Sequence, residues 1–179
     1  MEKIYSWHNH HYFHAFWEER EQTYKQSLLF PKSTYSPWLY DVTFLKSYDA
    51  IKDNTLVDIY RCYELWQISS RLKNSKAAII EVGVWRGGTA ALLAKANNNN
   101  SPVYLCDTFE GVAKASEKDN RYKGGEHADT SIEIVDTLMN QHGIADYHIL
   151  KGIFPDVNAG LLELQKFKIC HIDVDVYDS

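Results

Sequence analysis

The chain has 179 residues, which is enough for one α/β domain with a hydrophobic core and gives no reason to expect a second domain. Apolar residues make up 45% and charged residues 24%, values near the globular average that exclude disordered and fibrous proteins. The 24 acidic and 19 basic residues give a net charge of -5. The chain therefore lacks the basic surface that binds a run of phosphates, and we expect no nucleic-acid partner.

Neither the N-terminal sequence nor any later segment has an apolar run of the length that a signal peptide or a membrane span needs. The three cysteines, Cys62, Cys106 and Cys170, are far apart and each has apolar neighbours. This pattern predicts buried free thiols in a reducing compartment. We therefore expect a cytoplasmic protein that does not bind membranes.

The N-terminal part of the chain differs in character from the rest. Residues 1–35 are rich in aromatic and histidine side chains and show no strand pattern, which predicts a helical or irregular extension. Apolar residues at helical spacing then predict a helix that ends at about Leu72. At its start, Thr55 stands three residues before Asp58, which is a variant of the capping box.

Four segments are predicted as strands, and the first, residues 77–82, is a nearly continuous apolar run typical of a parallel strand that is covered on both faces. Helical patterns separate these segments, and the alternation predicts right-handed crossovers in an α/β fold. Thr89 is expected to cap the helix after the first strand, Thr130 to Glu133 is expected to open the next helix as a capping box, and Gly143 can end it. The predicted strands are residues 77–82, 103–107, 147–150 and 168–175, with a short helical stretch at 161–165 before the last.

The first strand ends in a glycine-rich segment, Glu81-Val82-Gly83-Val84-Trp85-Arg86-Gly87-Gly88, which predicts a nucleotide-type turn between a strand and a helix. In a dinucleotide-binding turn a second glycine lets the backbone approach a pyrophosphate, but Trp85 occupies that place and argues against NAD. S-adenosylmethionine has no pyrophosphate and tolerates a bulky residue there. Gly83 would form the tight turn, and Gly87 and Gly88 would let the chain pass close to the ligand. The alternative is that these glycines only shape the turn.

Two features follow the second predicted strand. Asp107 ends that strand, where its carboxylate can accept hydrogen bonds from the ribose hydroxyls of a cofactor; a turn or helix-capping role is the alternative. The polar stretch from Thr108 to Asp129 is longer than usual loops, so it is either an active-site lid or a disordered insertion. The lid is favoured because the stretch leaves the carboxyl end of a strand, where ligands bind in such sheets.

His171, Asp173 and Asp175 alternate along the fourth predicted strand and would project to the same side of the sheet. Burying these side chains costs free energy unless something cationic or reactive lies nearby. Oxygen ligands of this kind suit magnesium, which could hold a substrate hydroxyl and lower its pKa for attack on a methyl group. The alternative is that the strand frays into solvent and the aspartates are hydrated.

Several segments together resemble the macrocin O-methyltransferases of the TylF type, which methylate sugar hydroxyls in natural-product pathways. The resemblance extends from about residue 37 to the end of the chain, and the combination of motifs is far more specific than any one of them. The matching segments are Pro37-Trp38 to Asp41, Asn54-Thr55-Leu56-Val57-Asp58, Glu81 to Gly88, Asp107-Thr108-Phe109-Glu110-Gly111, Lys151-Gly152-Ile153-Phe154 and Ile172-Asp173-Val174-Asp175-Val176-Tyr177-Asp178-Ser179.

The resemblance implies a Rossmann-like class I methyltransferase fold with a mostly parallel sheet. Residues 1–70 would form an N-terminal helical extension, and residues 71–179 would form the domain that binds S-adenosylmethionine. Magnesium would be held partly by Asp173, the segment Phe109-Glu110-Gly111 would begin the lid, and the protein would be a homo-oligomer. The implied cofactor-binding residues are Glu81, Gly83, Val84, Trp85, Arg86, Gly87, Gly88, Asp107, Thr108 and Phe109.

Relatives of this type continue with further strands and with a second aspartate pair that completes the metal site. By that comparison we expect the fold to be truncated after its fourth strand. If the strand order of the family holds, the fourth strand lies beside the first and is an open edge of the sheet.

The sequence therefore supports one leading hypothesis and two alternatives. The first is an O-methyltransferase that depends on S-adenosylmethionine and magnesium and acts on a sugar or related hydroxyl. In it, Asp173 binds the metal, and His171 or Asp175 assists deprotonation. The second is a non-catalytic remnant or interaction module that keeps the cofactor-binding half of the fold. The third is a nicotinamide oxidoreductase, against which Trp85 counts.

Overall fold

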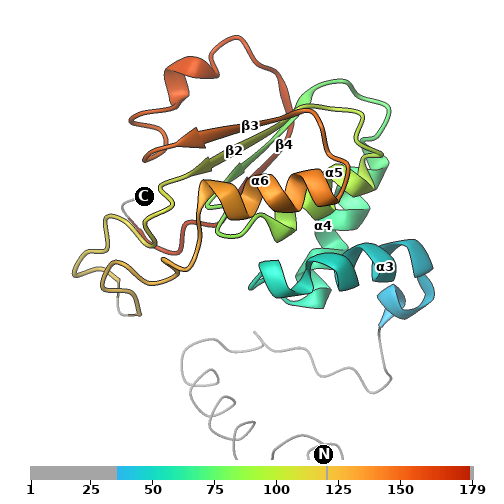
Figure 1. Ribbon diagram of the computed structural model, residues 1–179, viewed down its shortest axis with the longest axis horizontal. Coiled ribbons are helices and arrows are strands. Elements are labelled where there is room, and N and C mark those ends of the chain that lie inside the picture. The colour runs from blue at the N-terminus through green and yellow to red at the C-terminus, as the bar shows by residue number, and fades with distance from the viewer. Residues whose placement is uncertain (1–35, 120, 178–179) are drawn as a thin grey trace, which may run out of the picture. The chain divides into compact units, whose positions relative to one another are not determined.

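Four parallel strands form the sheet of the computed structural model, which describes residues 36–119 and 121–177 (Figure 1). The central strand is β1, because it pairs with β2 on one side and with β4 on the other. The α/β class and the parallel sheet predicted from the sequence are thus confirmed. The strands are β1 (Ala78–Val82), β2 (Val103–Asp107), β3 (Tyr147–Lys151) and β4 (Phe167–Ile172), in the spatial order β3-β2-β1-β4.

Helices cover one face of the sheet, and the loop between β3 and β4 lies on the other (Figure 1). The compact unit runs from Pro37 to Ser179, so α3 and α4 share a core with the sheet, whereas the predicted extension at residues 1–35 lies outside the described residues. Among the described helices, none is long and apolar enough to cross a membrane. The helices are α3 (Val42–Ile51), α4 (Ile59–Arg71), α5 (Gly88–Ala96) and α6 (Ile132–Gln141), with short 3-10 helices η1 (Pro37–Tyr40), η2 (Lys52–Asn54) and η3 (Ala159–Leu161).

Both faces of the sheet contribute to hydrophobic clusters, which explains why β1 and β2 have nearly continuous apolar sequences. Successive side chains of a strand point to opposite faces, so Ile79 and Leu105 face the helices while Ile80 and Tyr104 face the other side. The cluster under the helices also holds Phe44, Trp66, Leu92, Leu93, Val135 and Met139. The cluster on the opposite face holds Ala78, Ile80, Val82, Tyr104, Cys106 and Leu162.

The first turn of α4 lies later in the chain than predicted. Asp58 caps this helix, because its carboxylate accepts a hydrogen bond from the backbone N–H of Arg61 at 2.9 Å. Thr55 does not cap it; its hydroxyl lies 2.9 Å from the hydroxyl of Thr89. Thr89 is likewise not the cap of α5, because that helix already begins at its N-cap, Gly87, in the left-handed conformation.

The cap of α6 also differs by one residue from the prediction. Ser131 is the N-cap, and its hydroxyl accepts from the backbone N–H of Ile134 at 3.2 Å. The hydroxyl of Thr130, the predicted cap, donates instead to the backbone carbonyl of Trp85. Gly143 follows the end of the helix with a φ of 62°, which agrees with its predicted role in ending α6.

The last strand is shorter than predicted. β4 ends at Ile172, and the chain then turns at Asp175, which has a φ of 66°. The predicted alternation therefore stops before Asp175, so this aspartate does not share the strand geometry of His171. The helical stretch predicted at 161–165 is a short 3-10 helix at Ala159–Leu161.

Lys168 lies where the pairing of β1 with β4 shifts by one residue, which makes it an extra residue in β4. Its ammonium group bonds to the loop after α4, to the end of α5 and to the segment before β2, and so ties these three parts of the chain together. The acceptors are the backbone oxygens of Leu72 and Ser75, at 3.1 and 2.9 Å, the side-chain oxygen of Asn97 at 2.6 Å and the hydroxyl of Ser101 at 2.8 Å.

Replacement of Lys168 by methionine is expected to lower the free energy of unfolding by about 2 kcal/mol, because it leaves these acceptors without their charged donor. Urea denaturation monitored by circular dichroism measures the change. Lys166→Met is the matched control, since Lys166 is exposed and takes no part in this cluster. Equal denaturation midpoints for the two variants would contradict the assigned role.

The three thiols differ in their surroundings. Cys62 and Cys106 are buried free cysteines, as predicted, whereas Cys170 is exposed. Burial raises the pKa of Cys62 to about 12 and that of Cys106 to about 11, so both stay protonated at pH 8. We expect iodoacetamide to label Cys170 in the native protein at pH 8 and to label the other two only after denaturation, as peptide mass spectrometry would show. Rapid native labelling of Cys62 would contradict this expectation.

Candidate functional site

A cavity of about 730 Å³ opens at the carboxyl end of the sheet, where β1, β2 and β4 end. This is the edge at which open α/β sheets bind ligands, and the volume is that of a typical small-molecule site. The loop after β2, residues 108–130, forms part of the wall together with the start of α4. We call residues 108–130 the lid. Its position agrees with the lid interpretation of the polar stretch.

Most of the predicted site residues border this cavity, but some do not. The predicted cofactor residues that line it are Glu81, Gly83, Val84, Trp85, Asp107 and Thr108, and the predicted catalytic residues that line it are Asp173 and Asp175. Arg86, Gly87, Gly88, Phe109 and His171 do not line it.

The glycine turn has the geometry expected of Gly83 but not that expected of Gly88. Gly83 has a φ of 84°, and a Cβ atom there would overlap the backbone carbonyl of Asp173, so the turn packs directly against the chain that follows β4. A Cβ atom at Gly88 would overlap the carbonyl of Asn54. Gly88 therefore allows the close packing of α5 against the end of η2, rather than the approach of a ligand.

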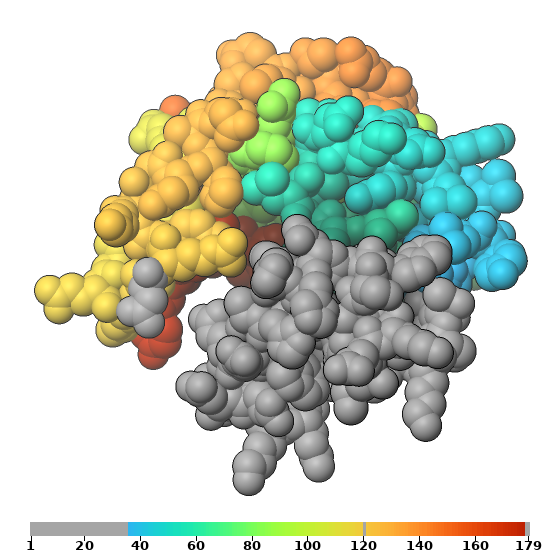
Figure 2. Space-filling view, turned by 90° about the horizontal axis from the view of Figure 1, so that it is seen from below, coloured from blue at the N-terminus to red at the C-terminus, as the bar shows by residue number. Residues whose placement is uncertain are grey.

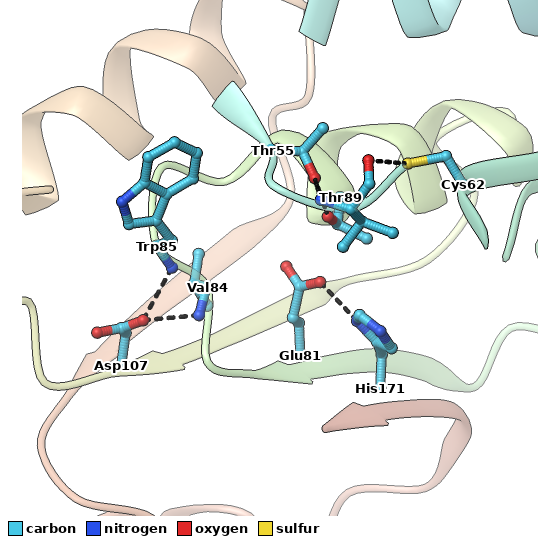
Figure 3. Close-up of polar contacts among 9 residues, drawn as sticks. Thr55, Cys62, Glu81, Val84, Trp85, Thr89, Asp107 and His171 are labelled. Atoms are coloured by element: carbon cyan, nitrogen blue, oxygen red, sulfur yellow. Dashed lines mark hydrogen bonds and ion pairs between the residues drawn. The ribbon is translucent and has the colours of Figure 1, made fainter. Parts of the chain in front are cut away.

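Asp107 holds the glycine turn in place. One of its carboxylate oxygens accepts the backbone N–H groups of Val84 at 2.6 Å and Trp85 at 2.9 Å (Figure 3). The other accepts the N–H of Phe109 at 2.7 Å, at the start of the lid. Asp107 is thus a turn aspartate, which was the alternative interpretation. Because two carboxylate oxygens offer about four acceptor positions, a ribose hydroxyl can still bind there.

A side-chain hydrogen bond between Glu81 and His171 links β1 to β4. Glu81 is only 1% exposed, and one of its oxygens lies 2.8 Å from Nδ1 of His171 (Figure 3). Burial raises the pKa of Glu81, and the hydrogen bond that His171 donates to Glu81 raises the pKa of His171. His171 is therefore occupied by its hydrogen bond to Glu81. It does not line the cavity, whereas a group that removes a proton from the substrate would have to do so.

The second oxygen of Glu81 is buried and has no hydrogen-bond partner within residues 36–119 and 121–177. Glu81 borders the cavity, and Figure 3 shows that it rises on the same side of the sheet as Asp107. An unsatisfied buried carboxylate oxygen costs free energy unless a donor or a cation binds it. The site therefore suits a ligand with a positively charged donor.

The end of the lid is fastened to the glycine turn through Trp85. The indole N–H of Trp85 donates to Asp129 at 2.9 Å, and its backbone carbonyl accepts from the hydroxyl of Thr130. Arg86 lies 3.8 Å from the same Asp129 carboxylate and 5.6 Å from the centre of the Trp85 ring. Arg86 thus supports the lid from outside the cavity.

The predicted magnesium site is not assembled by the residues that the structure describes. In that part of the chain, no group of three or more histidine, cysteine, aspartate or glutamate side chains is placed to hold a metal ion. Asp173 and Asp175 both line the cavity, but residues 36–119 and 121–177 supply no third such ligand beside them. The described residues alone therefore do not fit a bound metal ion.

Sequence reasoning missed several residues that line the cavity. They come from the loop before α4, from the first turns of α4 and α5, and from the lid, where apolar periodicity does not show which polar side chains point into the cavity. The available signal for such cavity-lining residues was the presence of polar aromatic and histidine side chains inside a loop. The missed residues include Thr55, Arg61, Thr89, Arg121, Tyr122, Glu126, His127 and Thr130.

A parallel sheet in the order β3-β2-β1-β4, a glycine turn after β1, an acidic residue at the end of β2 and a lid over the cavity together define a Rossmann-like methyltransferase fold. The sequence profile of the macrocin-O-methyltransferase (TylF) family matches residues 54–179. The chain belongs to this family. A comparison with curated proteins gave no match.

Among the solved structures with a similar fold, two are described as methyltransferases. CalS11, a calicheamicin methyltransferase, matches with a TM-score of 0.58 and 14% identity over 82% of this chain and 71% of that one. Cofactor-bound Rv0187 from MTB matches with a TM-score of 0.48 and 18% identity over 91% of this chain and 60% of its own. An O-methyltransferase from Bacillus cereus in complex with SAH gives a TM-score of 0.46 and 18% identity over 90% of this chain and 61% of its own. The chain thus spans less than two thirds of the last two proteins.

Proposed function

We propose that this chain transfers a methyl group from S-adenosylmethionine to a hydroxyl oxygen of a small, sugar-containing acceptor. The observation that carries the proposal is the buried oxygen of Glu81 that borders the cavity without a hydrogen-bond partner in the described residues. S-adenosylmethionine has an ammonium group on its amino-acid end, which is the kind of donor that such a carboxylate binds. Membership of the TylF family and the similar calicheamicin methyltransferase support a natural-product acceptor.

In this proposal the residues of the cavity have separate roles. The glycine turn and Asp107 hold the adenosine end of the cofactor, and Glu81 holds its ammonium group. The acceptor oxygen forms a bond to the methyl carbon while the carbon–sulfur bond breaks and the sulfur keeps the electron pair. The proton of the acceptor hydroxyl passes to a carboxylate at the cavity, either Asp173 or Asp175. His171 is excluded from that role because it is bonded to Glu81.

The family resemblance also implies magnesium at Asp173. Since the described residues do not gather a third ligand, we derive no step through a metal ion. The same observation favours a second candidate function, in which the chain binds the cofactor but does not transfer its methyl group.

Isothermal titration calorimetry tests the cofactor part of the proposal. We expect S-adenosylmethionine and S-adenosylhomocysteine to bind and NAD not to bind, because Trp85 occupies the place of the glycine that approaches a pyrophosphate. Absence of binding by both sulfur compounds would overturn the proposal. Mass spectrometry of a panel of glycosylated natural products incubated with protein and cofactor then separates transfer from binding alone.

We also propose that the chain acts as a homo-oligomer in the cytoplasm. Exposed apolar side chains on η1, α3 and α4 supply a surface for self-association, and the free cysteines suit a reducing compartment. Light scattering after size-exclusion chromatography measures the oligomeric state, and a monomer at high concentration would contradict the first part. The exposed side chains are Leu39, Tyr40, Val42, Tyr60 and Ile68.

A further inference from the structure

The chain after β4 adopts a strained turn at the edge of the cavity. The backbone N–H of Val176 donates to the carbonyl of Val174 at 2.8 Å, which closes a three-residue turn around Asp175. Asp175 has a φ of 66°, so this is the rare form of the γ-turn with positive φ. Such a conformation persists only where surrounding contacts hold it.

The lid supplies contacts that hold Asp175. The hydroxyl of Tyr122 donates to one carboxylate oxygen of Asp175 at 2.9 Å. Nε2 of His127 lies 4.0 Å from the other carboxylate oxygen. The rings of Tyr122 and His127 are neighbours, with centroids 5.8 Å apart, so both side chains lie beside Asp175. All three residues border the cavity.

A second pair of contacts connects the same parts of the chain. The backbone N–H of Tyr177 donates to the carboxylate of Asp119 at 2.9 Å, and the ammonium group of Lys118 lies 4.3 Å from the centre of the Tyr177 ring. Figures 1 and 2 both show the lid, in yellow, beside the segment after β4, in red. The lid thus meets this segment over several residues and not through one side chain.

We propose that Tyr122 and His127 are positioning residues that hold the Asp175 carboxylate at the cavity only while the lid lies against the segment after β4. When the lid moves away, the strained turn at Asp175 loses the contacts that maintain it, and the carboxylate is free to leave the cavity. This part of the site is therefore assembled by the lid, whereas the cofactor end is assembled by Asp107 and the glycine turn without Tyr122.

The consequence for the reaction rests on the proposed methyl transfer. If Asp175 contacts the acceptor hydroxyl, it does so in the closed arrangement, in which the lid also excludes water from the methyl group. An acceptor would then meet a complete site only after the lid has closed over it. Loss of the lid contact should impair this end of the cavity and leave the binding of the cofactor unchanged.

Amide hydrogen exchange tests the lid contact directly, because the N–H of Tyr177 is bonded across the interface and that of Val176 closes the strained turn. Tyr122→Phe is expected to raise the exchange rates of both amides about three- to tenfold, as loss of one hydrogen bond of ordinary strength would. Tyr147→Phe is the matched control, since it removes a tyrosine hydroxyl from an aspartate, Asp136, that is not part of the lid.

A double-mutant cycle shows whether Tyr122 acts through Asp175. In an Asp175→Ala background, Tyr122→Phe should raise exchange no further, because the acceptor is already absent. Asp175→Asn should keep exchange near the wild-type rate, since its amide oxygen can still accept the hydroxyl. Wild-type exchange in Tyr122→Phe, or the full additional effect in the Asp175→Ala background, would overturn the proposal.

Calorimetry with S-adenosylhomocysteine separates this proposal from the proposed function. We expect Tyr122→Phe to bind this ligand with the wild-type affinity. If the variant loses affinity, the lid contact serves the cofactor end and the assignment to Asp175 is wrong. If the wild-type protein itself fails to bind, the proposed function fails, whereas the exchange results still decide whether the lid positions Asp175.

Discussion

Replacement of Gly83 by alanine is expected to lower the free energy of unfolding by about 3 kcal/mol and to abolish cofactor binding. Two costs add. The φ of 84° at Gly83 costs a residue with a Cβ atom about 1–2 kcal/mol. The added Cβ would also overlap the backbone carbonyl of Asp173, which cannot yield unless the chain after β4 moves away from β1. That movement would displace Asp173 from the cavity.

Gly143→Ala is the matched control for this variant. Gly143 also has a positive φ, 62°, but a Cβ atom there would meet no other atom within 4 Å. Gly143→Ala therefore lowers the free energy of unfolding only through the strained backbone conformation, by about 1 kcal/mol, and should leave cofactor binding unchanged. Urea denaturation and calorimetry with S-adenosylhomocysteine measure both effects. If the two variants lose the same stability, the close approach of Gly83 to Asp173 is not important.

The sequence was sufficient to predict β1, β2 and β3 almost to the residue. β1 and β2 are short apolar runs that end at a turn, and such runs result from burial of both faces of a parallel sheet. Helix starts were predicted less well, because Thr55 and Asp58 are both acceptable caps and tertiary contacts decide between them. Thr55 is bonded to Thr89 across the interface between the loop before α4 and α5.

The pairing of Glu81 with His171 could not be predicted, because β1 and β4 are far apart in the sequence and their register is set by tertiary structure. The extra residue at Lys168 decides this register. Without it, simple alternation from Phe167 would place His171 on the opposite face, away from Glu81. A shift of one residue reverses the facing of every later side chain in a strand, and no local pattern reveals it.

The position of the cavity could be predicted from the sequence better than the contacts made by the chain after β4. Gly83, Asp107 and the lid follow from the order of strands and loops, since ligands bind where parallel strands end. The contacts of Asp175 with Tyr122 join two irregular segments, for which sequence offers no periodicity. Asp175 was expected in a strand because it alternates with Asp173, but the strained turn after β4 interrupts that alternation.

Replacement of Glu81 by glutamine is expected to weaken the binding of S-adenosylmethionine about 10- to 100-fold. The change keeps the shape of the side chain and its acceptor for His171, but it removes the ionisable carboxyl group that borders the cavity. A hydrogen bond between charged partners contributes about 1.5–3 kcal/mol, which corresponds to that loss of affinity.

The same variant should not destabilise the protein in the absence of ligand. Glu81 is 1% exposed and one of its oxygens has no hydrogen-bond partner in the described residues, so a neutral amide has less desolvation to overcome than a carboxylate. We expect the urea midpoint of Glu81→Gln to equal or exceed that of the wild type. Opposite changes in stability and affinity at one residue would indicate that Glu81 is held in its buried position for binding and not for folding.

Glu163→Gln is the control, because Glu163 is an exposed glutamate outside the cavity. It should change neither the urea midpoint nor the affinity measured by calorimetry. Wild-type affinity in Glu81→Gln would show that the ammonium group of the cofactor binds elsewhere. A large loss of stability would show instead that the charge of Glu81 is needed to hold His171 and β4 against β1. Either result would remove the support that Glu81 gives to the proposed function.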